Sequence, residues 1–214
     1  MKIAVFGAAG EVGSRIVEES LERGHNVLAV VRRESQCEAL QNDVEPFLAD
    51  AMISDDVVKV VKKADFIISA LRPVEGLEFL LPQLTDNILK AAREFSKRAV
   101  IVGGAASLKI PGDPDGHTVL SSPDFLPISI RDIALACQMQ FDICQKHDVA
   151  DWTYICPPAM LTPGERTGSF RLGKDELVQD QAGNSAISME DFAIACLDEA
   201  EQGTHLRQRF TVGY

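Results

Sequence analysis

The chain has 214 residues, of which 46% are hydrophobic and 25% charged, and its formal net charge is −11. This composition is typical of a globular protein with its own core, and the length fits one domain over residues 1–214. The negative charge disfavours a nucleic-acid or anionic-membrane partner, because such surfaces need clustered lysine and arginine. No apolar run approaches the roughly 20 residues that span a bilayer, and the N-terminus resembles a strand rather than a signal peptide. We therefore expect a cytoplasmic protein.

A glycine-rich turn lies near the start of the chain. Residues 3–6 form an apolar run that predicts a buried strand, and apolar residues recur at helical spacing from Val12 until Gly24. Between them the glycines have the spacing G-x-x-G-x-x-G. Strand, glycine turn and helix in this order are typical of a dinucleotide site, in which helix N–H groups face the pyrophosphate. The alternative is a tight connection without a ligand. The predicted cofactor residues here are Gly7, Ala8, Ala9, Gly10, Glu11, Val12 and Gly13.

The end of the second predicted strand, over 26–31, indicates which dinucleotide is held. Arg32 and Arg33 follow this strand about 20 residues after the glycine turn. An acidic residue here would bind a ribose 2′-hydroxyl, whereas arginine accommodates a 2′-phosphate. The pair therefore favours NADP(H) over NAD(H), although Glu11 could oppose a 2′-phosphate. Two solvated charges at a strand end are the alternative.

Further strand patterns at 44–49, 65–70, 98–102, 151–156 and 209–214 alternate with helical patterns. This alternation predicts an α/β fold, a Rossmann-like doubly wound parallel sheet with a small irregular C-terminal elaboration. Pro82 suits the first turn of one helix, and Ser54, Ser129-Ile-Arg-Asp132 and Ser188-Met-Glu-Asp191 are predicted to cap three others. Such sheets bind ligands at the carboxyl ends of their strands. Further cofactor residues are therefore predicted to be Asp50, Ala51, Ser69, Ala70, Leu71, Gly103 and Gly104.

Two long connections have little periodicity. Residues 105–128 are rich in glycine, proline and aspartate, which indicates a lid or a disordered loop. Residues 157–185 are expected to form an irregular flap with short strands over the substrate. The five cysteines have scattered spacings without a C-x-x-C pair, so no metal site is predicted.

Several segments carry a family resemblance. The chain resembles atypical short-chain dehydrogenases/reductases in Gly7-Ala-Ala-Gly10, Val102–Leu108, Asp151-Trp-Thr-Tyr154, Pro163–Gly168, Ile187–Asp191 and Arg209–Tyr214. Members of this family are described as NAD(P)-dependent oxidoreductases or NADH-flavin reductases. They are akin to NmrA-like proteins and to flavin/biliverdin reductases. The resemblance covers nearly the whole chain. It implies a Rossmann fold whose NAD(P) also contacts the turn at Pro157 and Pro158. Relatives often have threonine at the position of Ala9 and a polar or basic residue at that of Glu11.

Dehydrogenases of the wider superfamily use a Tyr-x-x-x-Lys pair for proton transfer, and the predicted helix at 129–146 contains no tyrosine. Ser107 occupies the place of the superfamily's catalytic serine, with loop capping as the alternative. His117, in the predicted lid, could donate a proton or be an ordinary loop residue. Glu165 and Arg166 could meet a polar substrate or form a structural ion pair.

The leading hypothesis is an NAD(P)H-dependent oxidoreductase that passes hydride to a small planar acceptor. A flavin or quinone-like acceptor needs stacking and a dry site more than a dedicated acid, and a flavin would be a substrate rather than a tightly bound group. The alternatives are a non-catalytic NmrA-like NAD(P) redox sensor and, third, an NAD-dependent epimerase or dehydratase. The sequence does not indicate the oligomeric state.

Overall fold

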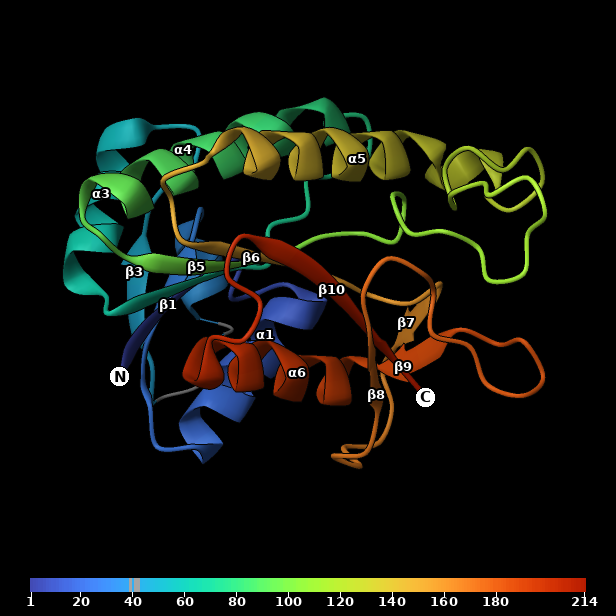
Figure 1. Ribbon diagram of the computed structural model, residues 1–214. Helices are drawn as coiled ribbons and strands as arrows, with labels where there is room; N and C mark the ends of the chain where they lie inside the picture. Colours follow the sequence, from blue (N-terminus) through green and yellow to red (C-terminus); the bar gives the residue numbers. More distant parts are fainter. Residues whose placement is uncertain (39, 41–42) are drawn as a thin grey trace.

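A computed structural model describes residues 1–38, 40 and 43–214 (Figure 1). Its main sheet consists of β3 (Glu45–Leu48), β2 (Asn26–Val31), β1 (Lys2–Phe6), β4 (Phe66–Ser69), β5 (Arg98–Val102), β6 (Trp152–Cys156), β10 (Gln208–Gly213) and β8 (Arg171–Gly173), in this spatial order. All neighbouring strands are parallel except β10 and β8, which are antiparallel. The predicted doubly wound parallel sheet is confirmed.

Helices cover both faces of the sheet, as Figure 1 shows. The lower layer in that view contains α1 (Glu11–Glu22) and α6 (Met189–Gln202), and the upper layer contains α3 (Ser54–Lys63), α4 (Leu81–Glu94) and α5 (Arg131–Lys146). The short elements are α2 (Glu34–Cys37), the 3₁₀ turns η1 (Glu78–Leu80) and η2 (Ile128–Ile130), and the small parallel sheet of β7 (Met160–Thr162) and β9 (Ala186–Ser188). The predicted flap thus contains short strands, one of which, β8, joins the main sheet.

The two cores follow from the two-residue period of the strands. In β1, Ala4 and Phe6 belong to the core beneath α3, α4 and α5, whereas Ile3 and Val5 belong to the core above α1 and α6. All four side chains are at most 1% exposed. Because β1 is buried on both faces, its sequence is continuously apolar instead of alternating.

The helix starts test the predicted caps. Ser188 is the N-cap of α6, where its hydroxyl accepts a hydrogen bond from the Asp191 N–H at 3.0 Å, so this prediction is confirmed. Pro82 lies in the first turn of α4, also as predicted. The Ser54 prediction is wrong, because the helical hydrogen bonds begin one residue earlier, at the Ile53 carbonyl. The Ser129 capping box is wrong too, because Ser129 lies inside η2 and Ile130 precedes α5.

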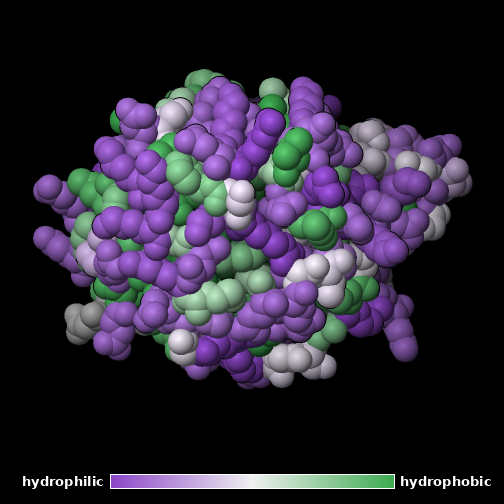
Figure 2. Space-filling model, turned by 60° about the vertical axis from the view of Figure 1, so that its left-hand side comes forward, coloured by the Kyte–Doolittle hydropathy of each residue, from purple (hydrophilic) through white to green (hydrophobic). Residues whose placement is uncertain are grey.

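The surface agrees with the composition. Figure 2 shows a face on which hydrophilic side chains surround small hydrophobic groups. In the part of the chain that the structure describes, no helix combines the length and apolarity required to cross a membrane.

Candidate functional site

The turn between β1 and α1 contains three glycines, and the packing of the protein itself requires two of them. Gly7 has a φ of +80°, and a Cβ there would lie 2.7 Å from the Ala70 carbonyl oxygen. A Cβ on Gly13 would lie 2.0 Å from the Gly7 carbonyl oxygen. Both glycines are therefore needed to bring β1, β4 and the start of α1 together.

The middle glycine is different. Gly10 is exposed, and a Cβ there would meet only the Gly7 carbonyl oxygen within 4 Å, at 3.2 Å. It is the N-cap of α1 but has no side chain to accept from the first-turn N–H groups. These N–H groups and the helix dipole suit a pyrophosphate beside Gly10. Around it, Ala8 is buried, Glu11 is exposed and Val12 is half-buried.

Arg32 and Arg33 follow β2 at the same edge of the sheet, and both are exposed. Gln36 holds their backbone, because its Oε1 accepts from the N–H of Arg32 at 3.2 Å and of Arg33 at 3.1 Å. Neither guanidinium is in an ion pair with a described residue, in contrast to Arg15, which pairs with Glu190. Both are therefore available to a 2′-phosphate.

The ends of β3 and β4 bring polar groups to the same edge of the sheet. Ser69 is 1% exposed, and its hydroxyl has no partner among the described residues. A buried hydroxyl without a partner is unfavourable, so this atom suits a group supplied by a ligand. Asp50 is half-buried and accepts from the Met52 N–H at 2.9 Å. Ala51 is buried, and Asn87 of α4 fixes it by donating to its carbonyl at 2.9 Å.

Asn87 is a positioning residue that the sequence reasoning missed. It is 7% exposed and also accepts from Gln83 at 2.9 Å. A polar residue on the apolar face of a predicted helix, next to Ile88, was the available indication.

The glycine pair at the end of β5 is explained by packing. A Cβ on Gly103 would lie 2.0 Å from Cζ of Tyr154, and one on Gly104 would lie 2.7 Å from Sγ of Cys137. Gly104 donates its N–H to the Tyr154 hydroxyl at 3.2 Å. The pair thus fixes the carboxyl end of β5 against β6 and α5. At the end of β6, Pro157 is half-buried and Pro158 buried.

Both tyrosines are committed to structural contacts. The Tyr154 hydroxyl donates to the Cys137 carbonyl or to Gln140 Oε1, which lie 2.9 and 3.1 Å away. Burial raises the pKa of Tyr154 well above its ordinary value. The Tyr214 hydroxyl contacts Ser188 Oγ and Asp191 Oδ2, each at 2.9 Å. Both tyrosine hydroxyls are thus engaged in hydrogen bonds within the protein.

Ser107 and His117 also have partners within the protein. Ser107 is 8% exposed, and its hydroxyl accepts from Arg209 Nη1 at 2.6 Å. The His117 ring lies 2.8 Å from Asp113, which also accepts from the His117 N–H at 2.7 Å. The structure therefore places both residues in contacts that organise the 105–128 connection. Asp115 joins Asp113 and His117 in a cluster whose ligand atoms lie within 4.8 Å of one another.

The flap is fastened to α6 through Asp191, which is 0% exposed. Its carboxylate accepts from the N–H groups of Thr167 and Gly168, each at 2.8 Å, and from the Thr167 hydroxyl. Burial opposes ionisation, but these hydrogen bonds and that from Tyr214 outweigh it and lower the pKa of Asp191. The motifs at 163–168, 187–191 and 214 thus form one network.

A second attachment joins the flap to α1. Glu19 is 3% exposed and accepts from Arg166 at 2.7 and 3.0 Å and from Arg23 at 2.7 Å. Burial opposes its ionisation, yet hydrogen bonds from Arg166 and Arg23 lower its pKa. Arg166 is therefore in a structural ion pair, although its partner is Glu19 rather than the neighbouring Glu165.

The flap should loosen in acid. The lowered pKa of Asp191 means that its stabilising effect is complete above about pH 4, the ordinary aspartate value, and is lost as the pH falls through the lower folded value. We expect Asp191→Asn to lower the free energy of unfolding by about 1–3 kcal/mol at pH 7 and by less at pH 3. Urea denaturation across this range measures both. The exposed Asp151→Asn is the control, and an equal cost at both pH values would contradict the assignment.

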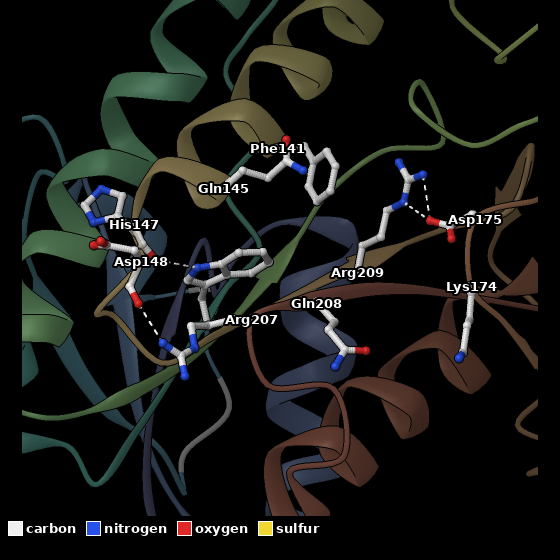
Figure 3. Close-up of a pocket in the computed structure, with 10 residues that line it drawn as sticks. Phe141, Gln145, His147, Asp148, Lys174, Asp175, Arg207, Gln208 and Arg209 are labelled. Atoms are coloured by element: carbon white, nitrogen blue, oxygen red, sulfur yellow. Dashed lines mark hydrogen bonds and ion pairs between the residues drawn. The ribbon is translucent and has the colours of Figure 1, made fainter.

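A surface cavity of about 460 Å³ lies elsewhere, beneath the end of α5 (Figure 3). Phe141, Trp152, Arg207 and Arg209 are among its lining residues, and Arg209 reaches Asp175. Trp152 and Arg207 flank the beginnings of β6 and β10, so this cavity is at the opposite end of the strands from the glycine turn. It is therefore separate from the predicted dinucleotide site.

Comparisons with known proteins identify relatives of this chain. Residues 7–202 match the model of the NAD(P)H-binding family. The Bacillus subtilis protein YwnB is 34% identical over 99% of this chain and 98% of its own. A candidate epimerase from Bacteroides thetaiotaomicron is 36% identical, with a TM-score of 0.88 over 100% of this chain and 96% of that one. A candidate NADH-flavin reductase from Streptococcus pneumoniae is 30% identical, with a TM-score of 0.83 over 100% of this chain and 99% of that one. The chain belongs to the NAD(P)H-binding family of atypical short-chain dehydrogenases/reductases.

Proposed function

We propose that the protein transfers hydride from NADPH to a planar acceptor, a flavin or a quinone. The observation that carries this proposal is the state of its two tyrosines, Tyr154 and Tyr214, whose hydroxyls are both hydrogen-bonded within the protein. Epimerisation and alcohol dehydrogenation in this superfamily use a tyrosine acid. Reduction of a flavin needs one hydride and one proton, and solvent can deliver the proton to the reduced flavin after hydride transfer, so a dedicated acid is dispensable.

In this proposal the residues of the chain bind and orient the cofactor and the acceptor. The first turn of α1 beside Gly10 would hold the pyrophosphate, and Arg32 and Arg33 the 2′-phosphate. NAD(P)H supplies the hydride when bound. The end of β5 at Gly104 would support the nicotinamide, and the 105–128 connection would exclude water from the acceptor.

Anaerobic oxidation of NADPH and NADH with FMN, riboflavin and quinones tests the proposal. We expect turnover with at least one of these acceptors. Tight NADPH binding without turnover on any of them would overturn it and favour the redox sensor.

Cofactor preference should depend on the arginine pair. We expect NADPH to bind more tightly than NADH, and Arg32→Ala/Arg33→Ala to weaken NADPH roughly ten- to a hundredfold, because a charge-assisted contact to phosphate typically contributes about 1.5–3 kcal/mol. NADH affinity should change little. Fluorescence titration of both cofactors measures this. Equal affinities that do not respond to the double substitution would point to Glu11 as the determinant of an NAD preference.

Neither Ser107 nor His117 should be indispensable. We expect Ser107→Ala and His117→Ala each to lower flavin reduction by less than about tenfold, whereas loss of a general acid typically costs 10²–10⁴-fold. Removal of residues 112–116 from the lid should cost more than either, because water would enter. Steady-state kinetics of the three variants measure this, and a thousandfold loss in Ser107→Ala would identify a proton-transfer enzyme.

A further inference from the structure

One arginine, Arg72, follows the carboxyl end of β4, at the edge of the sheet where the cofactor is expected. Arg72 follows the end of β4 by three residues and is exposed. Glu75 and Glu78 come next in the same connection, yet neither forms an ion pair with Arg72 in the described part of the chain. Other arginines have carboxylate partners, such as Arg98 with Glu199 and Arg209 with Asp175. The charge of Arg72 is therefore available to a ligand.

Packing around Cys137 joins the segment that carries Arg72 to the end of β5. Burial raises the pKa of the Cys137 thiol to about 11, and the positive charge of Arg72 partly opposes that rise. The same thiol lies 2.7 Å from the position that a Cβ on Gly104 would occupy. Leu71, the neighbour of Arg72, packs on the cluster that contains Cys137. The segment that carries Arg72 and the Gly104 end of β5 thus both meet the cluster that contains Cys137.

Apolar side chains surround the same edge. Val74, Leu77 and Phe79 are 57%, 39% and 66% exposed, and η1, which contains Phe79, packs against α5. Ile128, just before α5, is 90% exposed. The flat ring of an acceptor at this edge would contact apolar side chains, and an anionic group on the acceptor would find one cation, Arg72.

The overall charge makes this cation significant. At a net charge of −11 the protein repels anions at long range. An anionic acceptor therefore requires a local positive charge where it docks.

We propose that Arg72 is a specificity-determining residue that selects acceptors carrying a phosphate or carboxylate, and binds that group beside the Gly104 end of β5. This inference rests on the proposed function, because it concerns the acceptor of the same site. Phosphate and carboxylate share the relevant chemistry, because each is an oxyanion that can pair with a guanidinium. FMN and riboflavin form a matched pair of probes, because they have the same ring and differ by one phosphate.

The test compares kcat/KM for FMN and riboflavin at saturating NADPH in wild type, Arg72→Gln and Arg93→Gln. Arg93 is an exposed arginine in the last turn of α4, at the opposite end of the strands, and is the control. We expect wild type to prefer FMN, and Arg72→Gln to lower the FMN-to-riboflavin ratio about tenfold with riboflavin turnover unchanged. Arg93→Gln should keep the wild-type ratio.

Salt provides an independent measurement. Raising the ionic strength should increase the KM for FMN in wild type but not in Arg72→Gln, since screening weakens only charged contacts. Rescue by Arg72→Lys would show that charge matters more than fork geometry. The inference would be overturned if Arg72→Gln and Arg93→Gln had the same FMN-to-riboflavin ratio of kcat/KM and the same salt dependence. Turnover of riboflavin in that case would still support the proposed function. Absence of turnover with both flavins and with quinones would instead remove the proposed function, and this inference with it.

Discussion

Gly10→Val should abolish dinucleotide binding while the protein stays folded. A valine side chain would occupy the space in front of the first turn of α1, where the pyrophosphate must approach the helix N–H groups. Within the protein its Cβ would meet only the Gly7 carbonyl oxygen, at 3.2 Å, so the fold can accommodate it with a small shift. We expect at least a hundredfold weaker NADPH binding, measured by calorimetry.

Gly13→Ala is the matched comparison. Its Cβ would lie 2.0 Å from a backbone oxygen, so it should lower stability as well as binding. Cofactor binding by folded Gly10→Val at wild-type affinity would show that the pyrophosphate lies elsewhere.

The second large effect concerns stability. Gly103→Ala should lower the free energy of unfolding by about 3 kcal/mol or more, at the upper end of overpacking costs. The new Cβ would lie 2.0 Å from Cζ and 2.2 Å from Cε1 of the Tyr154 ring, which is fully buried and cannot move aside. For a chain of this length the melting temperature should fall by roughly 6–12 °C. Thermal and urea denaturation measure both quantities.

A double-mutant cycle separates this overlap from a general glycine effect. Tyr154→Phe should not relieve the cost, because the overlapping ring carbons remain. Tyr154→Leu should reduce it, because the ring is gone. A cost for Gly103→Ala that is the same in both backgrounds would contradict the explanation.

The main sheet could be predicted from the sequence because each strand is indicated by a pattern of neighbouring residues. Continuous apolar runs such as 3–6 and 98–102 predict strands buried on both faces, and their alternation with helical periods predicts parallel crossovers. The edge at which the strands end then follows from topology, which is why Gly10, Arg32 and Ser69 were predicted to lie at one end of the sheet. The Ser129 cap failed because a 3₁₀ turn and an α-helix have similar starts in sequence.

Contacts between distant segments could not be predicted in the same way. Ser107 lies against Arg209, and Arg166 pairs with Glu19, over separations of 102 and 147 residues. No periodicity or spacing encodes such partners. Likewise, Gly103 and Gly104 resemble ligand-binding glycines in sequence, and only the packing of Tyr154 and Cys137 reveals their structural requirement.

The two edges of the main sheet bear on aggregation. An open strand edge presents unpaired backbone groups onto which another chain can add, and long flat edges therefore promote fibrils. Here one edge, β3, has four residues and includes Pro46, which has no N–H to donate, and the other, β8, has only three residues. Neither edge offers a template long enough for stable strand addition. Concentrated solutions of the folded protein should therefore resist association through sheet extension.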